Sequence, residues 1–141
     1  VCFLNAFVIN ICLSLLVAFS GCSSMQDDSE RNNHLLYGDL IEHFKKDGIK
    51  VNSVTPLLAD VAKADIGLAL EINGRQIGVY KYNTKIKKQK EKLERIKEEG
   101  FLYLCAIKYP AIVNGSFVMV DYKNHPDEKK LVESFNSFSR K

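Results

Sequence analysis

The fold is decided by the stretch IGLALEINGRQIGV, which occupies residues 66–79. Apolar residues take every second position on both sides of its centre, which is the period of a strand with one buried face. The centre is the pair Asn73-Gly74. Both residues accept the positive φ angles that a type I′ turn requires, so the stretch predicts an antiparallel β-hairpin.

Further strands are predicted on both sides of this hairpin. Asn114-Gly115 repeats the turn signal, and residues 117–122 have strand character, which indicates a second antiparallel pairing. Residues 101–107 are apolar throughout, as in a strand covered on both faces, so we expect that strand to be central. Residues 49–54 are short and β-branched and precede Thr55-Pro56, which predicts an edge strand.

Three helices are predicted by apolar residues at helical spacing. The first is expected over 34–47, and Gly48 follows it as a stop. The second is expected over 84–99, with Asn83 as its N-cap and Gly100 just past its end. Pro126 suits the first position of the third helix. Residues 57–64 fit either a helical turn or a loop.

The predicted order of elements is therefore α-β-β-β-α-β-β-α. We expect an α+β fold in which an antiparallel sheet of about five strands carries three helices on one face. A chain of 141 residues suits one domain. The predicted organisation is a signal peptide over 1–21, a flexible polar stalk over 22–33 and a single α+β domain over 34–141.

The first 21 residues carry no charge, and residues 7–19 have the apolar character and length of a signal-peptide core. The chain starts at Val1 without an initiator methionine, so we expect either that a few residues precede it or that translation starts at an alternative codon. The leader ends in Phe19-Ser20-Gly21-Cys22, which resembles the bacterial lipobox. That resemblance implies cleavage before Cys22 and a diacylglycerol group on its sulfur. An uncleaved transmembrane anchor and a plain secreted protein are the alternatives.

Two acyl chains are enough for stable anchoring, so the predicted location is the extracytoplasmic side of a cell membrane. The net charge of +3 falls well short of the basic stripe of nucleic-acid-binding domains, and no nucleic-acid partner is expected. Three of the four cysteines, Cys2, Cys12 and Cys22, lie in the leader or at its end. This distribution excludes a disulfide framework.

The remaining cysteine, Cys105, has two interpretations. With His43 or His125 it would form a Cys-His pair suited to nucleophilic catalysis. Its neighbours are apolar, however, and apolar surroundings raise a thiol pKa, so we favour an inert, buried Cys105. No catalytic residue, cofactor or metal ligand is predicted. The histidines lack the close spacing of metal ligands, and they are His34, His43 and His125. Four carboxylates are expected to be surface charges, and they are Asp39, Glu42, Glu71 and Asp121.

The second predicted helix is rich in basic residues, which would suit docking on anionic lipid headgroups. Glutamates on the same helix favour a solvated face instead, because Lys87 with Glu91 and Glu91 with Arg95 have the spacing of i,i+4 pairs. The basic residues are Lys85, Lys87, Lys88, Lys90, Lys92, Arg95 and Lys97.

Tyrosines lie on or beside the strands, and most are expected to pack under helices. They are Tyr80, Tyr82, Tyr103, Tyr109 and Tyr122.

From Leu36 onward a series of motifs follows in order: Glu71-Ile72-Asn73-Gly74, Val79-Tyr80-Lys81-Tyr82, a charged helix, Tyr109-Pro110, Gly115 and Phe117-Val118-Met119-Val120. This order of motifs resembles a group of small uncharacterised lipoprotein domains of Gram-positive bacteria. The resemblance implies the fold and the location, and it carries no activity.

The function expected from the sequence is non-enzymatic: a lipid-anchored domain that binds a protein or envelope component through a sheet edge or a tyrosine-bearing surface. The alternative is an envelope-associated hydrolase or accessory enzyme whose site is assembled only in the fold. A small-ligand carrier is a third hypothesis, and it would need an apolar cavity.

Overall fold

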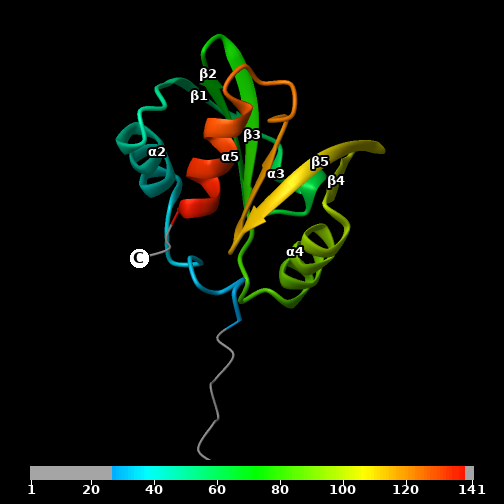
Figure 1. Cartoon of the computed structure of the whole chain (residues 1–141). Coiled ribbons are helices and arrows are strands. Elements are labelled where there is room, and N and C mark those ends of the chain that lie inside the picture. Colours follow the sequence, from blue (N-terminus) through cyan, green and yellow to red (C-terminus); the bar gives the residue numbers. More distant parts are fainter. Residues whose placement is uncertain (1–26, 139–141) are drawn as a thin grey trace, which may run out of the picture.

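The structure is a computed structural model that describes residues 27–138. Within these residues the chain forms one antiparallel sheet of six strands, in the order β1-β2-β3-β6-β5-β4, and four helices (Figure 1). The predicted α+β class is confirmed, and the expected counts of five strands and three helices are each one too low. The elements are α2 Tyr37–Lys46, β1 Val51–Leu57, α3 Ala59–Ala62, β2 Ile66–Ile72, β3 Arg75–Lys81, α4 Lys87–Glu99, β4 Phe101–Leu104, β5 Ile107–Asn114, β6 Phe117–Val120 and α5 Glu128–Ser137.

The predicted hairpin is confirmed as β2 and β3. Ile72 pairs with Arg75 across the turn, and Asn73 and Gly74 have φ angles of 50° and 73°. Strand β1 pairs with β2 at one edge of the sheet, as expected, but it continues through Pro56 to Leu57. Proline is tolerated in β1 because an edge strand needs hydrogen bonds on one side only.

The expectation of one central strand over residues 101–107 is wrong. The chain reverses at Cys105 and Ala106, whose φ angles are 48° and 67°, so the apolar run is split between edge strand β4 and strand β5. No glycine or asparagine marks this turn, which is why the apolar pattern concealed it. The hairpin predicted at Asn114-Gly115 is confirmed and joins β5 to β6, but its turn residues are Gly115 and Ser116, because Asn114 still pairs with Phe117 at the end of β5.

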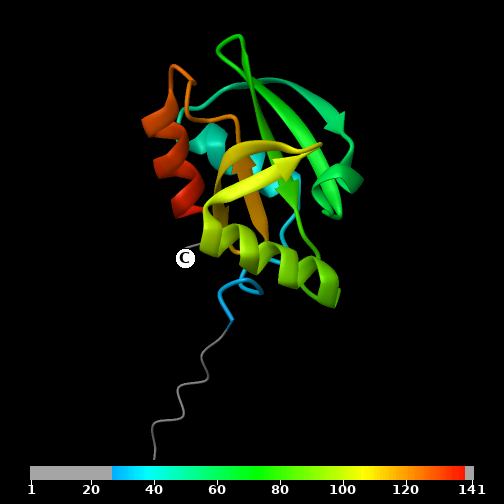
Figure 2. The same ribbon diagram turned by 90° about the vertical axis from the view of Figure 1, so that its right-hand side faces the viewer.

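Helices cover both faces of the sheet, whereas one covered face was expected. Along β3, Ile77 and Val79 belong to the core under α2 and α5, while Tyr80 belongs to a second core with Leu93 and Ile96 of α4. Figure 1 shows α2 and α5 on one side of β3 and α3 and α4 on the other, and Figure 2 looks onto α4 with β4 and β5. The central strands are apolar on both faces because both faces are buried.

The helix ends differ from the predicted ones by a few residues. Helix α4 begins after Ile86, so Asn83 is not its N-cap, although Gly100 follows its end with a φ of 71° as predicted. Helix α5 starts at Glu128, which places Pro126 outside it. The segment that fitted a turn or a loop contains the short helix α3. Among residues 27–138, no helix combines the length and apolar character needed to cross a bilayer.

Residues 27–35 form an N-terminal strap that is packed against the domain. Its Asn32 is completely buried, and the amide donates to the Asn114 carbonyl over 2.9 Å and accepts from the Ser116 backbone N–H over 2.6 Å. The expectation of a flexible polar stalk over residues 22–33 therefore fails for residues 27–33. A polar composition does not exclude order when a side chain satisfies buried backbone groups.

Two ion pairs fasten the start of the strap to α4. Lys90 Nζ lies 2.5 Å from Asp27 Oδ2, and Lys97 Nζ lies 3.1 Å from Asp28 Oδ2. The hydrogen bond from Lys90 lowers the pKa of Asp27 to about 2. The strap, blue in Figure 1, therefore leaves the domain beside α4, at the end opposite the β2–β3 turn. The predicted signal peptide and Cys22 lie outside the described residues.

Candidate binding site

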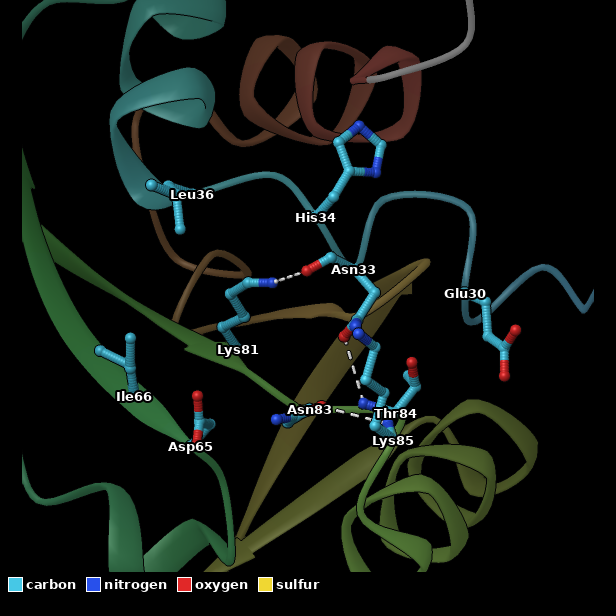
Figure 3. Close-up of a pocket in the computed structure, with 10 residues that line it drawn as sticks. All are labelled: Glu30, Asn33, His34, Leu36, Asp65, Ile66, Lys81, Asn83, Thr84 and Lys85. Carbon is cyan, nitrogen blue, oxygen red and sulfur yellow. Dashed lines mark hydrogen bonds between the residues drawn. The ribbon is translucent and has the colours of Figure 1, made fainter.

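A hollow of about 470 Å³ lies where the strap crosses the sheet beside the end of β3. Its walls come from the strap, the start of α2, the first residues of β2, the end of β3 and the segment that leads to α4 (Figure 3). Sequence-distant segments meet here because Lys81, the last residue of β3, pairs with Ile66 on one side and with Phe117 on the other. The lining residues are Glu30, Asn33, His34, Leu36, Asp65, Ile66, Lys81, Asn83, Thr84 and Lys85.

Lys81 is the unusual member of this group. It continues the inward alternation of Ile77 and Val79, and only 6% of its surface is exposed. Its Nζ donates to the Asn33 carbonyl over 2.7 Å and lies 5.0 Å from the centroid of the Phe117 ring. Among residues 27–138, no carboxylate oxygen lies within 4.0 Å of this ammonium nitrogen.

The electrostatics of Lys81 follow from this position. Burial lowers the pKa of its ammonium, and the negative charge of Asp65 acts in the opposite direction. An ammonium group has three donors, so two remain after the bond to Asn33. A buried charge without a close counter-ion is expensive, and lysine is rarely buried unless it is paired.

The walls around Lys81 are partly apolar. Leu36 and Ile66 are 63% and 40% exposed, and Figure 3 shows their side chains pointing toward each other across one side of the hollow. The Asp65 carboxylate lies below Ile66 in the same view, and Glu30 stands apart at the far rim. The hollow thus presents an ammonium, a carboxylate and an apolar wall within one small volume.

Backbone hydrogen bonds hold the polar rim in place. The Asn33 side-chain oxygen accepts from the Thr84 N–H over 3.1 Å, and the Asn83 side-chain oxygen accepts from the Lys85 N–H over 3.1 Å. Because Asn32 next to this rim is buried, the strap wall is anchored to the core of the domain. A fixed rim lowers the cost of ordering a site on binding.

The structure places Cys105 in the exposed turn between β4 and β5, so the expectation of a buried thiol is wrong.

The histidines occupy three separate sites. His34 lines the hollow, His43 Nε2 lies 2.9 Å from the Ser134 carbonyl oxygen, and His125 Nε2 lies 2.8 Å from the Ile72 carbonyl oxygen. Among residues 27–138, no cluster of His, Cys, Asp and Glu side chains is suited to hold a metal ion.

The four carboxylates considered above are also dispersed. Asp39 accepts from the Leu36 N–H over 2.7 Å at the start of α2, and Glu42 pairs with Lys46 at 3.2 Å. Glu71 accepts from the Ser53 hydroxyl over 3.0 Å. Asp121 lines another hollow, of about 440 Å³, with a φ of 62° and a pKa raised by partial burial.

The basic residues of α4 divide into two groups. Of the two expected i,i+4 pairs, Lys87 with Glu91 forms at 3.8 Å, and Glu91 with Arg95 is not within 4.0 Å. Lys90 and Lys97 hold the strap instead. Three others, Lys88, Lys92 and Arg95, line a hollow of about 270 Å³ together with Lys63, which follows α3.

Three of the tyrosines, Tyr80, Tyr82 and Tyr122, are buried, as expected for residues packed under helices. Tyr103 is exposed.

Lys81 was not predicted from the sequence, although a signal was present: the alternation of Ile77 and Val79 points position 81 toward the core. A charged residue at an inward position is a candidate for function.

Comparison with known proteins adds no assignment. No protein-family model matches the chain, and no curated protein or solved structure gives a significant match. The resemblance to Gram-positive lipoprotein domains therefore stays a prediction. The function has to be argued from the leader, the strap and the hollow beside Lys81.

Proposed function

We propose that this chain is a non-enzymatic binding domain that a lipid on Cys22 holds at the extracytoplasmic side of a membrane, where it binds a protein or envelope component. The leader and the lipobox-like residues support the anchor. One observation supports the binding role most directly: within residues 27–138 the buried Lys81 ammonium has one hydrogen-bond acceptor, which leaves two donors beside an open hollow.

The strap supports a defined orientation at the membrane. Cys22 precedes Asp27 by five residues. Five residues span at most about 18 Å, so a lipid on Cys22 keeps the strap end of the domain close to the bilayer. The hollow beside Lys81 is lined by strap residues and lies at this end. The β2–β3 turn lies at the other end (Figure 1).

The anchor is tested by metabolic labelling with an alkyne fatty acid, followed by purification of the full chain from membranes. We expect the label on the native chain and on Cys105→Ala, and none on Cys22→Ala. Cys105 is the matched control because its thiol is exposed and nothing in its surroundings resembles a lipobox. Equal labelling of Cys22→Ala would remove the anchor from the proposal.

The binding role is tested by crosslinking in intact cells before purification. A discrete crosslinked product that forms with the native chain and diminishes in Lys81→Met supports a partner at the hollow. Crosslinking that is absent, or unchanged in a folded Lys81→Met variant, contradicts it. The two experiments are independent, so the anchor and the binding role stand or fall separately.

A hydrolase or accessory enzyme is the second candidate, and Asp121 is the observation that favours it. Its pKa is raised by burial, it has a positive φ, and its charge helps to raise the pKa of Tyr80. A strained, partly buried carboxyl is a general feature of active sites. Hydrolysis of an envelope polymer by the native chain, lost in Asp121→Asn, would favour this candidate.

A further inference from the structure

Resting on the binding role proposed above, we propose that the hollow beside Lys81 binds an α-carboxylate that carries an apolar side chain. The carboxylate accepts hydrogen bonds from Lys81 Nζ, and the side chain packs on Leu36 and Ile66. Two sources present this chemistry: a free apolar amino acid and the C-terminal residue of a peptide.

The charge balance at Lys81 favours a carboxylate ligand. Its single hydrogen bond goes to a neutral acceptor, the Asn33 carbonyl, and among residues 27–138 no carboxylate lies within 4.0 Å. A glutamine would hold the same carbonyl without the cost of burying a charge. The ammonium is therefore better explained by an acceptor that arrives with the ligand, because charge-assisted hydrogen bonds to a carboxylate are the strong ones.

The apolar wall favours a ligand with an apolar side chain. Leu36 and Ile66 are among the few large apolar side chains that stay substantially exposed in residues 27–138, and both line this hollow. They come from different elements, the start of α2 and the first residue of β2, and they face each other in Figure 3. Covering these two side chains favours a ligand with an apolar group next to its carboxylate.

The carboxylate of Asp65 distinguishes the two sources of this ligand chemistry. Asp65 lies on the wall opposite the strap, and its charge acts on Lys81 without pairing with it. A carboxylate in this position complements an α-ammonium, which a free amino acid has and a peptide C-terminus lacks. The volume of about 470 Å³ lies within the range of about 300–1,000 Å³ that is usual for small-molecule sites.

The experiment is a titration of the full chain, purified from membranes in a nonionic detergent, with four probes: leucine, N-acetyl-leucine, leucinamide and glycine. Calorimetry gives the affinity, and amide chemical shifts of residues 33–36 and 81–84 give the place. We expect leucine to bind more tightly than glycine and leucinamide not to bind. Tighter binding of leucine than of N-acetyl-leucine assigns the free amino acid, and the reverse assigns a peptide C-terminus.

Variants locate the ligand groups. Lys81→Met is expected to weaken leucine binding by at least about 10-fold, which is the usual scale for a lost charged hydrogen bond. Lys50→Met is the matched control, because Lys50 is exposed and does not line the hollow. Leu36→Ser changes an exposed side chain that the fold does not need, so it tests the site even if Lys81→Met does not fold. It should reduce the preference for leucine over glycine by about 3-fold or more.

The proposal is overturned if leucinamide binds as tightly as leucine, or if no probe changes the amide chemical shifts of residues 33–36 and 81–84. It is also overturned if Leu36→Ser and a folded Lys81→Met both bind leucine with the affinity of the native chain. Each of these results leaves the crosslinking of the native chain to an envelope partner untouched. Failure of this inference is thereby distinguishable from failure of the proposed binding role.

Discussion

Asn32→Ala tests whether the N-terminal strap is part of the folded domain. In the structure the Asn32 amide is completely buried and satisfies the Asn114 carbonyl and the Ser116 N–H. It also accepts from the Ser116 hydroxyl over 3.0 Å. Alanine removes all of these partners and leaves buried backbone groups without hydrogen bonds.

The magnitude follows from the two backbone groups that lose their partner. An unsatisfied buried donor or acceptor costs about 1–3 kcal/mol, so the two groups together predict a loss of about 2–6 kcal/mol in the free energy of unfolding. This loss is a large part of the stability of a domain, which is about 5–15 kcal/mol. With a slope of about 2 kcal/mol per molar urea, the unfolding midpoint should fall by roughly 1–3 M.

The assay is urea unfolding of the full chain in nonionic detergent, followed by far-ultraviolet circular dichroism because the chain has no tryptophan. Asn52→Ala is the control, since Asn52 is exposed on edge strand β1 and should change the free energy by less than about 0.5 kcal/mol. If Asn32→Ala is as mild as the control, the strap is not docked as described, and the reasoning about the hollow that it lines fails with it.

Three further predictions concern other parts of the domain. Burial raises the pKa values of Tyr37 and Tyr82 above the ordinary value of 10.0. The stability that these two neutral hydroxyls contribute is therefore complete below pH 10.0 and is lost as the pH rises further. Absorbance at alkaline pH should show that both tyrosines ionise only when the domain unfolds. Gly67→Ala would place its Cβ 2.8 Å from Tyr80 Cε1, and we expect a loss of about 1–3 kcal/mol in thermal or urea unfolding. The exposed Cys105 should react with a maleimide in the native state, whereas protection until unfolding would contradict the β4–β5 turn.

Local turn chemistry made much of the fold predictable. Asn73-Gly74 marks its turn because few other residue pairs accept the required φ angles, and Gly115 and Gly100 mark the β5–β6 turn and the end of α4 because glycine accepts a positive φ. The turn at Cys105-Ala106 was not predictable in this way. Its conformation is imposed by the pairing of β4 with β5, which residue preferences do not encode.

The candidate site was less predictable than the fold because it depends on tertiary neighbours. Asn32 lies in a polar segment, and its burial follows from its contact with the β5–β6 turn, which joins residues more than 80 positions apart. Lys81 is one lysine among many in the sequence, and its burial follows from the strap above it and Phe117 beside it. Composition and periodicity describe single segments, so they do not reveal groups that several segments bring together.

Mass spectrometry of the chain isolated from cell membranes shows whether a lipid on Cys22 holds this domain at the membrane. We expect the mature chain to begin at Cys22 and its sulfur to carry a diacylglycerol group. An unmodified thiol at position 22, or a leader still joined to the domain, would contradict it.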